Sequence, residues 1–165
     1  MKGEAPHDPA EVAATVEQYC ELRARIERGE ADWTDLADLF TDDVVFIDPA
    51  WGRVEGIDEL RTFLSDSMMG LEDWSFPIEF AAIDGDNVVI KWIQQLPGTR
   101  ADGSRYAQSG SSTLIYAGDG KFRYEEDLLN MAHVLEDLAS SGWRPGEGFN
   151  TPPPEPNRDF SRPRG

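Results

Sequence analysis

The sequence is poor in cysteine and contains no long apolar run. Its 165 residues include one cysteine, Cys20, so no disulfide can form within the chain, and a reducing cytoplasm is the expected location. No apolar stretch approaches the roughly 20 residues that a helix needs to cross a bilayer. Residues 1–8 lack the apolar core of a signal peptide. We therefore expect a protein without disulfides or membrane segments.

Positive charge is also scarce. The chain has 15 lysines and arginines against 32 aspartates and glutamates, which gives a formal net charge of −17 at pH 7. Such a surface repels nucleic-acid phosphates and anionic lipid headgroups, so neither kind of partner is expected.

The signatures of several common catalytic centres are missing. The two histidines, His7 and His133, are isolated, and no His/Asp/Glu spacing suggests a metal site. No Gly-rich phosphate loop follows a predicted strand, and no Gly-x-Ser-x-Gly segment occurs. We therefore expect no metal and no cofactor.

Helical patterns dominate the first half of the chain. Val12, Val16 and Tyr19 recur at helical spacing after the start signal Asp8-Pro9. Similar spacing appears again in three later segments. Helices are predicted over residues 9–28, 33–40, 57–69 and 131–138.

The second half carries mainly strand patterns. Apolar residues alternate there with polar ones, and tight Gly/Asp turns at 84–87 and 118–120 separate consecutive runs. Consecutive strands joined by tight turns predict an antiparallel meander. Strands are predicted over residues 44–47, 76–80, 88–92, 106–117 and 122–129, with a turn at 48–52 and a loop at 97–104.

These elements form one α+β domain over residues 1–142, followed by a Pro/Gly-rich tail over residues 143–165. The tail is expected to be irregular, because its composition offers little to bury. For the same reason we expect the fold not to depend on it.

Residues 39–52 read Leu-Phe-Thr-Asp-Asp-Val-Val-Phe-Ile-Asp-Pro-Ala-Trp-Gly, so that a strand ends in Asp-Pro followed by an apolar residue and glycine. This segment, its continuation at 56–63 and the order of elements over 10–141 resemble the nuclear transport factor two-like superfamily. The superfamily includes ketosteroid isomerases and SnoaL-like polyketide cyclases, and the local match is most similar to the isomerases. The resemblance implies a cone-shaped, curved antiparallel sheet, covered by N-terminal helices and enclosing an apolar pocket.

The resemblance also implies catalytic roles for two residues. Asp48 matches the base that moves a proton between carbons, and Tyr19 matches a donor to the developing oxyanion. A carboxylate at a strand end, roofed by Trp51, is expected to have a raised pKa and hence to be a better base near neutral pH. The alternative interpretation is that Asp48 only binds the backbone of its own turn.

The third long strand and its neighbours depart from the isomerase pattern. Ser112 stands where the isomerases have a protonated aspartate. Asp127, on the fourth strand, resembles the acid of small polyketide cyclases and limonene-type epoxide hydrolases. Trp92 and Gln94 occupy the positions of the Arg-x-Asp that those hydrolases need. The predicted substrate-lining residues are Trp51, Trp92, Gln94, Gln108 and Ser112.

Three functions remain open on the sequence alone. The first is cofactor-free proton transfer on a hydrophobic carbonyl compound, with Asp48, Tyr19 and Asp127 as catalytic residues. The second is polyketide-type ring closure or, with less support, epoxide hydrolysis by Asp127. The third is a non-catalytic binding or assembly domain. Enzymes of the first two kinds need Asp48 or Asp127 inside an enclosed cavity, whereas a binding domain would expose both to solvent.

A homodimer is expected, because proteins of this shape often pair through the exposed face of the long sheet. Trp92, Ile93 and Tyr116 lie on strands that would supply this interface.

Overall fold

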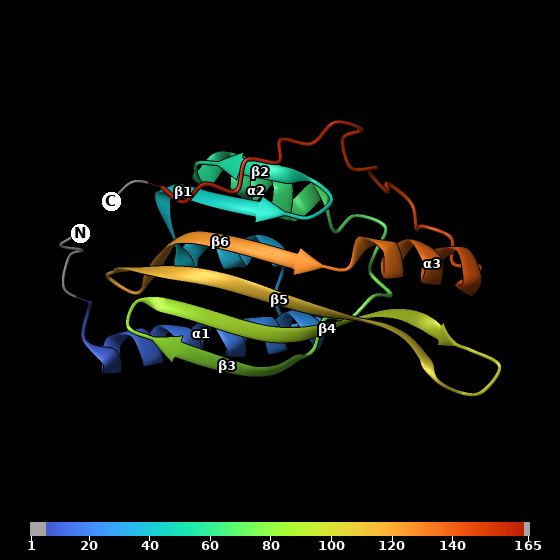
Figure 1. Cartoon of the computed structure of the whole chain (residues 1–165), viewed down its shortest axis with the longest axis horizontal. Coiled ribbons are helices and arrows are strands. Elements are labelled where there is room, and N and C mark those ends of the chain that lie inside the picture. Colours follow the sequence, from blue (N-terminus) through green and yellow to red (C-terminus); the bar gives the residue numbers. More distant parts are fainter. Residues whose placement is uncertain (1–5, 164–165) are drawn as a thin grey trace.

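The computed structural model describes residues 6–163. A single curved sheet of six strands is covered on one face by two helices and a 3-10 segment, and a third helix closes one end of the sheet (Figure 1). The predicted α+β cone is therefore confirmed. No helix among residues 6–163 combines the length and apolar character needed to cross a bilayer.

Local capping signals position the helices. Helix α1 (Pro9–Glu27) starts where the Asp8 side chain accepts a hydrogen bond from the Ala10 N–H, as the Asp-Pro start signal predicts. Asn130 caps α3 (Met131–Ser141) in the same manner, and Gly142 ends it in the left-handed conformation. The remaining two elements are the 3-10 segment η1 (Trp33–Leu39) and helix α2 (Ile57–Asp66).

The sheet has the order β2-β1-β6-β5-β4-β3. Four consecutive strands, β3 to β6, pair antiparallel with their sequence neighbours, so the predicted meander is confirmed. The six strands are β1 (Phe40–Asp48), β2 (Gly52–Glu55), β3 (Ile78–Asp84), β4 (Asn87–Thr99), β5 (Arg105–Gly118) and β6 (Lys121–Leu129).

Two features of the sheet differ from the sequence prediction. Residues 53–55, for which no element is predicted, form β2 together with the turn residue Gly52 and pair antiparallel with β1. Strand β1 begins at Phe40, four residues earlier than expected, and pairs parallel with β6. The chain returns to the side of β1 only after α2 and the whole meander, and this long crossover permits the parallel direction. The sheet is therefore mixed, with one parallel pair.

The main core lies between the inner face of the sheet and the helices. Trp92 and Tyr116 belong to it, with 4% and 1% of their surfaces exposed. Strand alternation directs these two side chains inward, so a dimer face on their strands would consist of the residues that alternate with them. Ile93 points to the opposite face and is partly exposed.

The tail forms no helix or strand over residues 143–163, yet it makes specific contacts with the domain. It leaves α3, runs back over α2 and reaches the edge strand β2 (Figure 1). The Gly146 N–H donates to the Gly70 carbonyl at 3.0 Å, and the Arg53 N–H donates to the Asn157 carbonyl at 2.9 Å. The composition predicts little burial, but backbone groups and a few aromatic side chains attach the segment.

Candidate functional site

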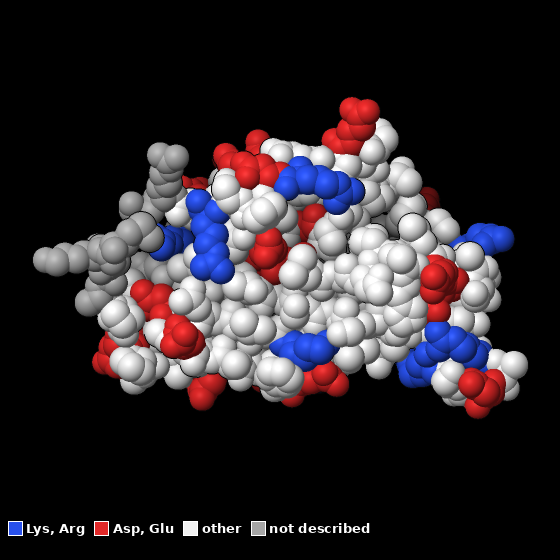
Figure 2. Space-filling model, viewed as in Figure 1, with Lys and Arg blue, Asp and Glu red and all other residues white. Residues whose placement is uncertain are grey.

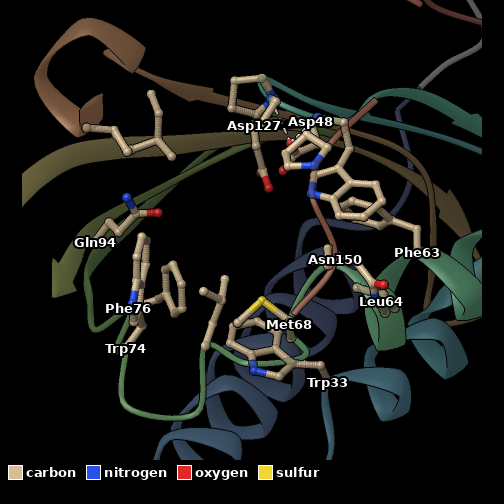
Figure 3. A pocket seen from close by; sticks show the side chains of 18 of the residues that line it. Trp33, Asp48, Phe63, Leu64, Met68, Trp74, Phe76, Gln94, Asp127 and Asn150 are labelled. Atoms are coloured by element: carbon tan, nitrogen blue, oxygen red, sulfur yellow. Dashed lines mark hydrogen bonds between the residues drawn. The ribbon is translucent and has the colours of Figure 1, made fainter. Parts of the chain in front are cut away.

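A cavity of about 400 Å³ lies between the inner face of the sheet, the helices and the tail (Figure 3). Its wall is mainly apolar and rich in aromatic rings, which suits a hydrophobic small molecule. The aromatic residues of the wall are Tyr19, Trp33, Phe46, Trp51, Phe63, Trp74, Phe76, Trp92, Trp143 and Phe149.

Asp48 and Asp127 both line this cavity, from adjacent strands. The parallel register of β1 and β6 pairs Ile47 with Glu126, so the next position on each strand is Asp48 and Asp127. Neighbouring strands lie about 4.8 Å apart. On its other side Asp127 pairs with Ser112 of β5. Two carboxyl groups and one hydroxyl group thus stand in a row across three strands.

Ser112 holds Asp127 in a defined orientation. The Trp92 indole N–H donates to Ser112 Oγ at 2.9 Å, which leaves the serine proton free to point at Asp127. Ser112 Oγ donates that proton to Asp127 Oδ1 at 2.5 Å. The Asp127 carboxyl group also shares a hydrogen bond with the Glu125 carboxyl group, and Figure 3 shows the Asp127 carboxyl group directed into the cavity.

Asp48 is held by its own turn as well as facing the cavity. Asp48 Oδ1 accepts hydrogen bonds from the backbone N–H groups of Ala50 at 2.7 Å and Trp51 at 2.8 Å. The turn interpretation is therefore correct for one carboxylate oxygen. The Asp48 Oδ2 atom has no hydrogen bond within the described part of the chain, so it is available to a ligand.

The two carboxyl groups have different proton affinities. Burial, followed by the negative charge of nearby Glu125, raises the pKa of Asp127 well above its ordinary value. Burial also raises the pKa of Asp48, but hydrogen bonds from Trp51 and Ala50 counteract it. Asp127 therefore holds its proton to a higher pH than Asp48 does.

Behind this row lies a second polar group, in which the predicted Tyr19 meets Glu125 and Arg23, two residues that the sequence analysis did not assign to the site. The Tyr19 hydroxyl donates to Glu125 Oε1 at 2.8 Å, and Arg23 Nη1 donates to the Tyr19 oxygen at 3.3 Å. Burial raises the pKa of Glu125, but the Tyr19 hydrogen bond and the Arg23 charge oppose this. The pKa of Glu125 stays raised, but less than that of Asp127, so Glu125 is the first of the two to ionise. The Tyr19 proton, predicted for an oxyanion, is directed at Glu125 in this arrangement.

Sequence signals for these residues existed. Arg23 follows Tyr19 by four positions, which places both on one face of α1. Glu125 precedes Asp127 by two positions, so strand alternation places both on one face of β6. Only their pairing across α1 and β6 required the tertiary structure.

The predicted substrate-lining residues fall into two sets. Trp51, Trp92 and Gln94 line the cavity directly. Ser112 and Gln108 lie one layer behind, where Ser112 bonds Asp127 and Gln108 accepts a hydrogen bond from Gln94 at 2.9 Å. No cluster of three or more metal-ligating side chains occurs within residues 6–163.

Comparisons with known proteins agree with this fold. The profile of the SnoaL-like domain family matches residues 7–124. A putative SnoaL-like polyketide cyclase from Jannaschia sp. CCS1 has a similar structure, with a TM-score of 0.62 and 18% identity, over 84% of this chain and 99% of that one. A second such protein, from Shewanella putrefaciens CN-32, has a TM-score of 0.61 and 18% identity, over 81% and 88% of the two chains.

A third similar structure contains a small molecule. TerC, co-crystallized with polyporic acid, has a TM-score of 0.59 and 16% identity, over 78% of this chain and 98% of that one. No curated protein matches the sequence. At these identities the solved structures establish the shared fold.

Proposed function

Because the chain belongs to the SnoaL-like domain family, we propose that it is an enzyme for cofactor-free proton transfer on a hydrophobic carbonyl compound. The observation that carries the proposal is the pair Asp48 and Asp127. They stand side by side in an aromatic cavity, and their surroundings push their proton affinities apart.

Each carboxyl group has a role in the proposed reaction. Asp48 Oδ2 removes a proton from the carbon beside the substrate carbonyl, and the electrons of that C–H bond move onto the carbonyl oxygen. The protonated Asp127 donates a hydrogen bond to this developing oxyanion, which stabilises it in a site with little water. Asp48 then returns its proton to another carbon of the same molecule, so that the substrate is isomerised and both acids are regenerated.

Asp127 thereby takes the part that a protonated aspartate on the neighbouring strand has in the isomerases that this sequence resembles. Ser112, which stands at that position, acts indirectly by orienting Asp127. Tyr19 was predicted as the oxyanion donor. Here we assign it to keeping Glu125 ionised, through its hydrogen bond to that carboxylate.

Ring closure of a polyketide-like compound is the second candidate. It begins with the same removal of a carbon-bound proton by Asp48. The enolate carbon then attacks a second carbonyl of the molecule and forms a C–C bond, and the resulting alkoxide oxygen takes the proton from Asp48. The similarity to putative polyketide cyclases favours this variant. Epoxide hydrolysis has less support, because Trp92 and Gln94 replace the Arg-x-Asp of the hydrolases. The placement of both acids on the cavity wall favours an enzyme over a purely binding domain.

The proposal is tested by hydrogen–deuterium exchange at carbon. Polycyclic ketones such as 2-tetralone are incubated in D₂O with the protein, and NMR follows loss of the proton beside the carbonyl. Replacing the base, Asp48→Asn, is expected to lower enzymatic exchange by roughly two to four orders of magnitude. Replacing the donor, Asp127→Leu, is expected to lower it by roughly two to three orders.

The matched control is Asp43→Asn, which removes an exposed carboxylate from the same strand as Asp48. It should leave the exchange rate unchanged. Exchange at the wild-type rate in both the Asp48 and the Asp127 variants would contradict the proposal.

The expected homodimer also remains a proposal. The outer face of the sheet exposes Phe80, Val89 and Leu128 to 56%, 40% and 57%. Figure 2, which views this face, shows a largely uncharged centre between scattered charged groups. Sedimentation equilibrium is expected to give twice the chain mass of 18.4 kDa, and Val89→Glu is expected to reduce it to the single mass. A wild-type protein of single mass at high micromolar concentration would end this proposal.

A further inference from the structure

A chain of hydrogen bonds links the cavity to Asp137, a buried carboxylate on helix α3. Gln94, on the cavity wall, donates through Nε2 to Gln108 Oε1 at 2.9 Å. Gln108 in turn donates through Nε2 to Asp137 Oδ2 at 2.6 Å. All three side chains are buried, with 5%, 1% and 5% of their surfaces exposed. The chain is therefore shielded from water over its whole length.

The Arg100 guanidinium and the hydrogen bond from Gln108 keep Asp137 ionised. Arg100 Nη2 lies 2.6 Å from Asp137 Oδ1, and His133 Nε2 lies 3.3 Å from Asp137 Oδ2. Burial alone would raise the pKa of Asp137, but the hydrogen bonds from Gln108 and Arg100 outweigh it and lower the pKa. An ionised carboxylate can only accept hydrogen bonds.

This restriction fixes both amides. Because Asp137 only accepts, Gln108 must turn its NH₂ group toward Asp137 and its oxygen toward Gln94. Gln94 must then turn its NH₂ group toward Gln108, which leaves its oxygen Oε1 for the cavity. Figure 3 shows the Gln94 oxygen on the cavity side, and no donor among residues 6–163 bonds to it.

We propose that Gln94 is a specificity determinant, which presents a fixed hydrogen-bond acceptor and selects substrates that carry a hydroxyl group remote from the reacting carbonyl. The inference rests on the proposed function, because it assumes a carbonyl held at Asp127. Asp137 acts on the substrate only through the two amides, as a positioning residue.

The register of the sheet sets the distance between the two polar ends of the site. Gln94 pairs with Gln108, and Asp127 pairs with Ser112, four residues farther along β5. Four residues along the strand and two strand spacings across give a separation on the order of 16 Å between the two backbones. Both side chains reach inward from a curved sheet, which shortens the span to that of a small polycyclic molecule. The substrate class is therefore a hydroxylated polycyclic ketone.

The test uses two probes with one skeleton, 3β-hydroxy-5α-androstan-17-one and 5α-androstane-3,17-dione. They differ only in carrying a hydroxyl or a carbonyl group at one end. The wild-type protein is expected to bind the hydroxyketone about tenfold more tightly by calorimetry, because the diketone leaves the Gln94 oxygen facing another acceptor. Equal affinity, tighter binding of the diketone or no binding of either probe would overturn the proposal.

The variant Asp137→Asn distinguishes a role of Asp137 in orienting Gln94 from a role in stability alone. Arg100 would hold the oxygen of the new amide, so its NH₂ group would face Gln108. Both glutamines would then reverse, and Gln94 would donate to the cavity. The preference is expected to invert in favour of the diketone, and an unchanged tenfold preference for the hydroxyketone would contradict the mechanism.

A second variant covers the case in which Asp137→Asn does not fold. Gln94→Met has a similar length and lacks the amide, so both probes should bind within about twofold of each other. Its control is Gln95→Met, on the opposite face of β4, which should keep the tenfold preference. Loss of the preference in Gln95→Met, or its survival in Gln94→Met, would contradict the role of Gln94.

The exchange experiment separates this inference from the proposed function. Carbon exchange by the wild type without a preference between the probes would remove the inference alone. A preference that follows Gln94 and Asp137, without any carbon exchange, would remove the proposed catalysis and retain Gln94 as a determinant of ligand binding.

Discussion

The sheet side and the tail side of the cavity differ in what they contribute. The sheet side carries Asp48, Asp127 and Gln94 on paired strands, each fixed by a hydrogen bond to a neighbouring group. The tail side contributes Phe149 and Asn150 from a segment without helix or strand. The polar side chains, whose positions must be accurate to about half an ångström, thus lie on the rigid sheet, whereas the tail mainly excludes water from the cavity.

The domain surface is shaped to receive the tail. Gly70 and Gly52 lie beneath the tail. A Cβ atom at position 70 would lie 2.7 Å from Phe149 Cβ, and one at position 52 would lie 2.5 Å from the Asn157 carbonyl oxygen. Trp143 packs edge-to-face against Trp74, with 5.1 Å between the ring centroids. The Asn150 amide donates to the Asp66 carbonyl at 3.1 Å. These contacts indicate that the tail is a part of the site.

Among the predicted changes, removal of the tail is expected to have the largest effect on ligand affinity and on thermal stability. A chain that ends at Gly142 loses the Phe149 side of the cavity and should bind a hydrophobic ketone at least tenfold more weakly. Its melting temperature should fall by roughly 3–8 °C, since aromatic surface at Trp74 becomes exposed. Calorimetry and thermal unfolding measure the two effects. A chain that ends at Pro154 keeps residues 149–152 and should keep its affinity. Wild-type affinity and melting temperature in the shorter chain would show that the tail is dispensable, as its composition predicts.

The second prediction concerns the close approach at Gly52. Gly52→Ala combines a positive φ of 84° with an overlap against Asn157, and it is expected to lower the free energy of unfolding by about 2–4 kcal/mol. Gly98→Ala has the same φ of 84° in open space and should lower it by only about 1 kcal/mol. Urea unfolding measures both variants.

The two alanine variants should become equivalent when the tail is absent. In a chain that ends at Gly142 the overlap with Asn157 no longer exists, so only the backbone strain at position 52 remains. A difference between the two variants that persists in the truncated chain would mean that the tail does not press on β2.

The smallest predicted effect is a pH dependence that belongs to the sheet side. The pKa of Asp127 is raised in the folded protein, so between its unfolded value of about 3.9 and the folded value the native state binds more protons. The contribution of Asp127 to stability is therefore full below about pH 4 and is lost as the pH rises through the folded pKa. The variant Asp127→Asn has no carboxyl group at this position and therefore lacks this pH-dependent contribution to stability. Above about pH 4 the free energy of unfolding of the wild type should fall relative to this variant as the pH rises through the folded pKa of Asp127. Parallel curves for Asp127→Asn would show that Asp127 is ionised in the fold.

Local chemistry in the sequence determined much of the fold. Asp8-Pro9 predicts the start of α1, and the Gly/Asp turns at 84–87 and 118–120 predict the meander, because these signals act over a few residues. The resemblance of the Asp-Pro segment to the isomerases implied, in addition, that Asp48 lies at a strand end beside the pocket. The sequence prediction missed strand β2, whose four residues are too few to show a clear alternation. It also missed the early start of β1, because Phe40 pairs with Phe122, which is distant in the sequence.

The composition of the site also divides between sequence and structure. The sequence by itself determined an acidic α+β domain with an aromatic interior, and its strand alternation placed Asp127 on the same face as Glu125. Only the tertiary structure decided that β1 pairs parallel with β6, which brings Asp48 beside Asp127, and that Asp137 orients Gln94 through Gln108. The physical reason is that such pairings join residues up to 79 positions apart in these cases, and their geometry depends on the completed packing rather than on any local pattern.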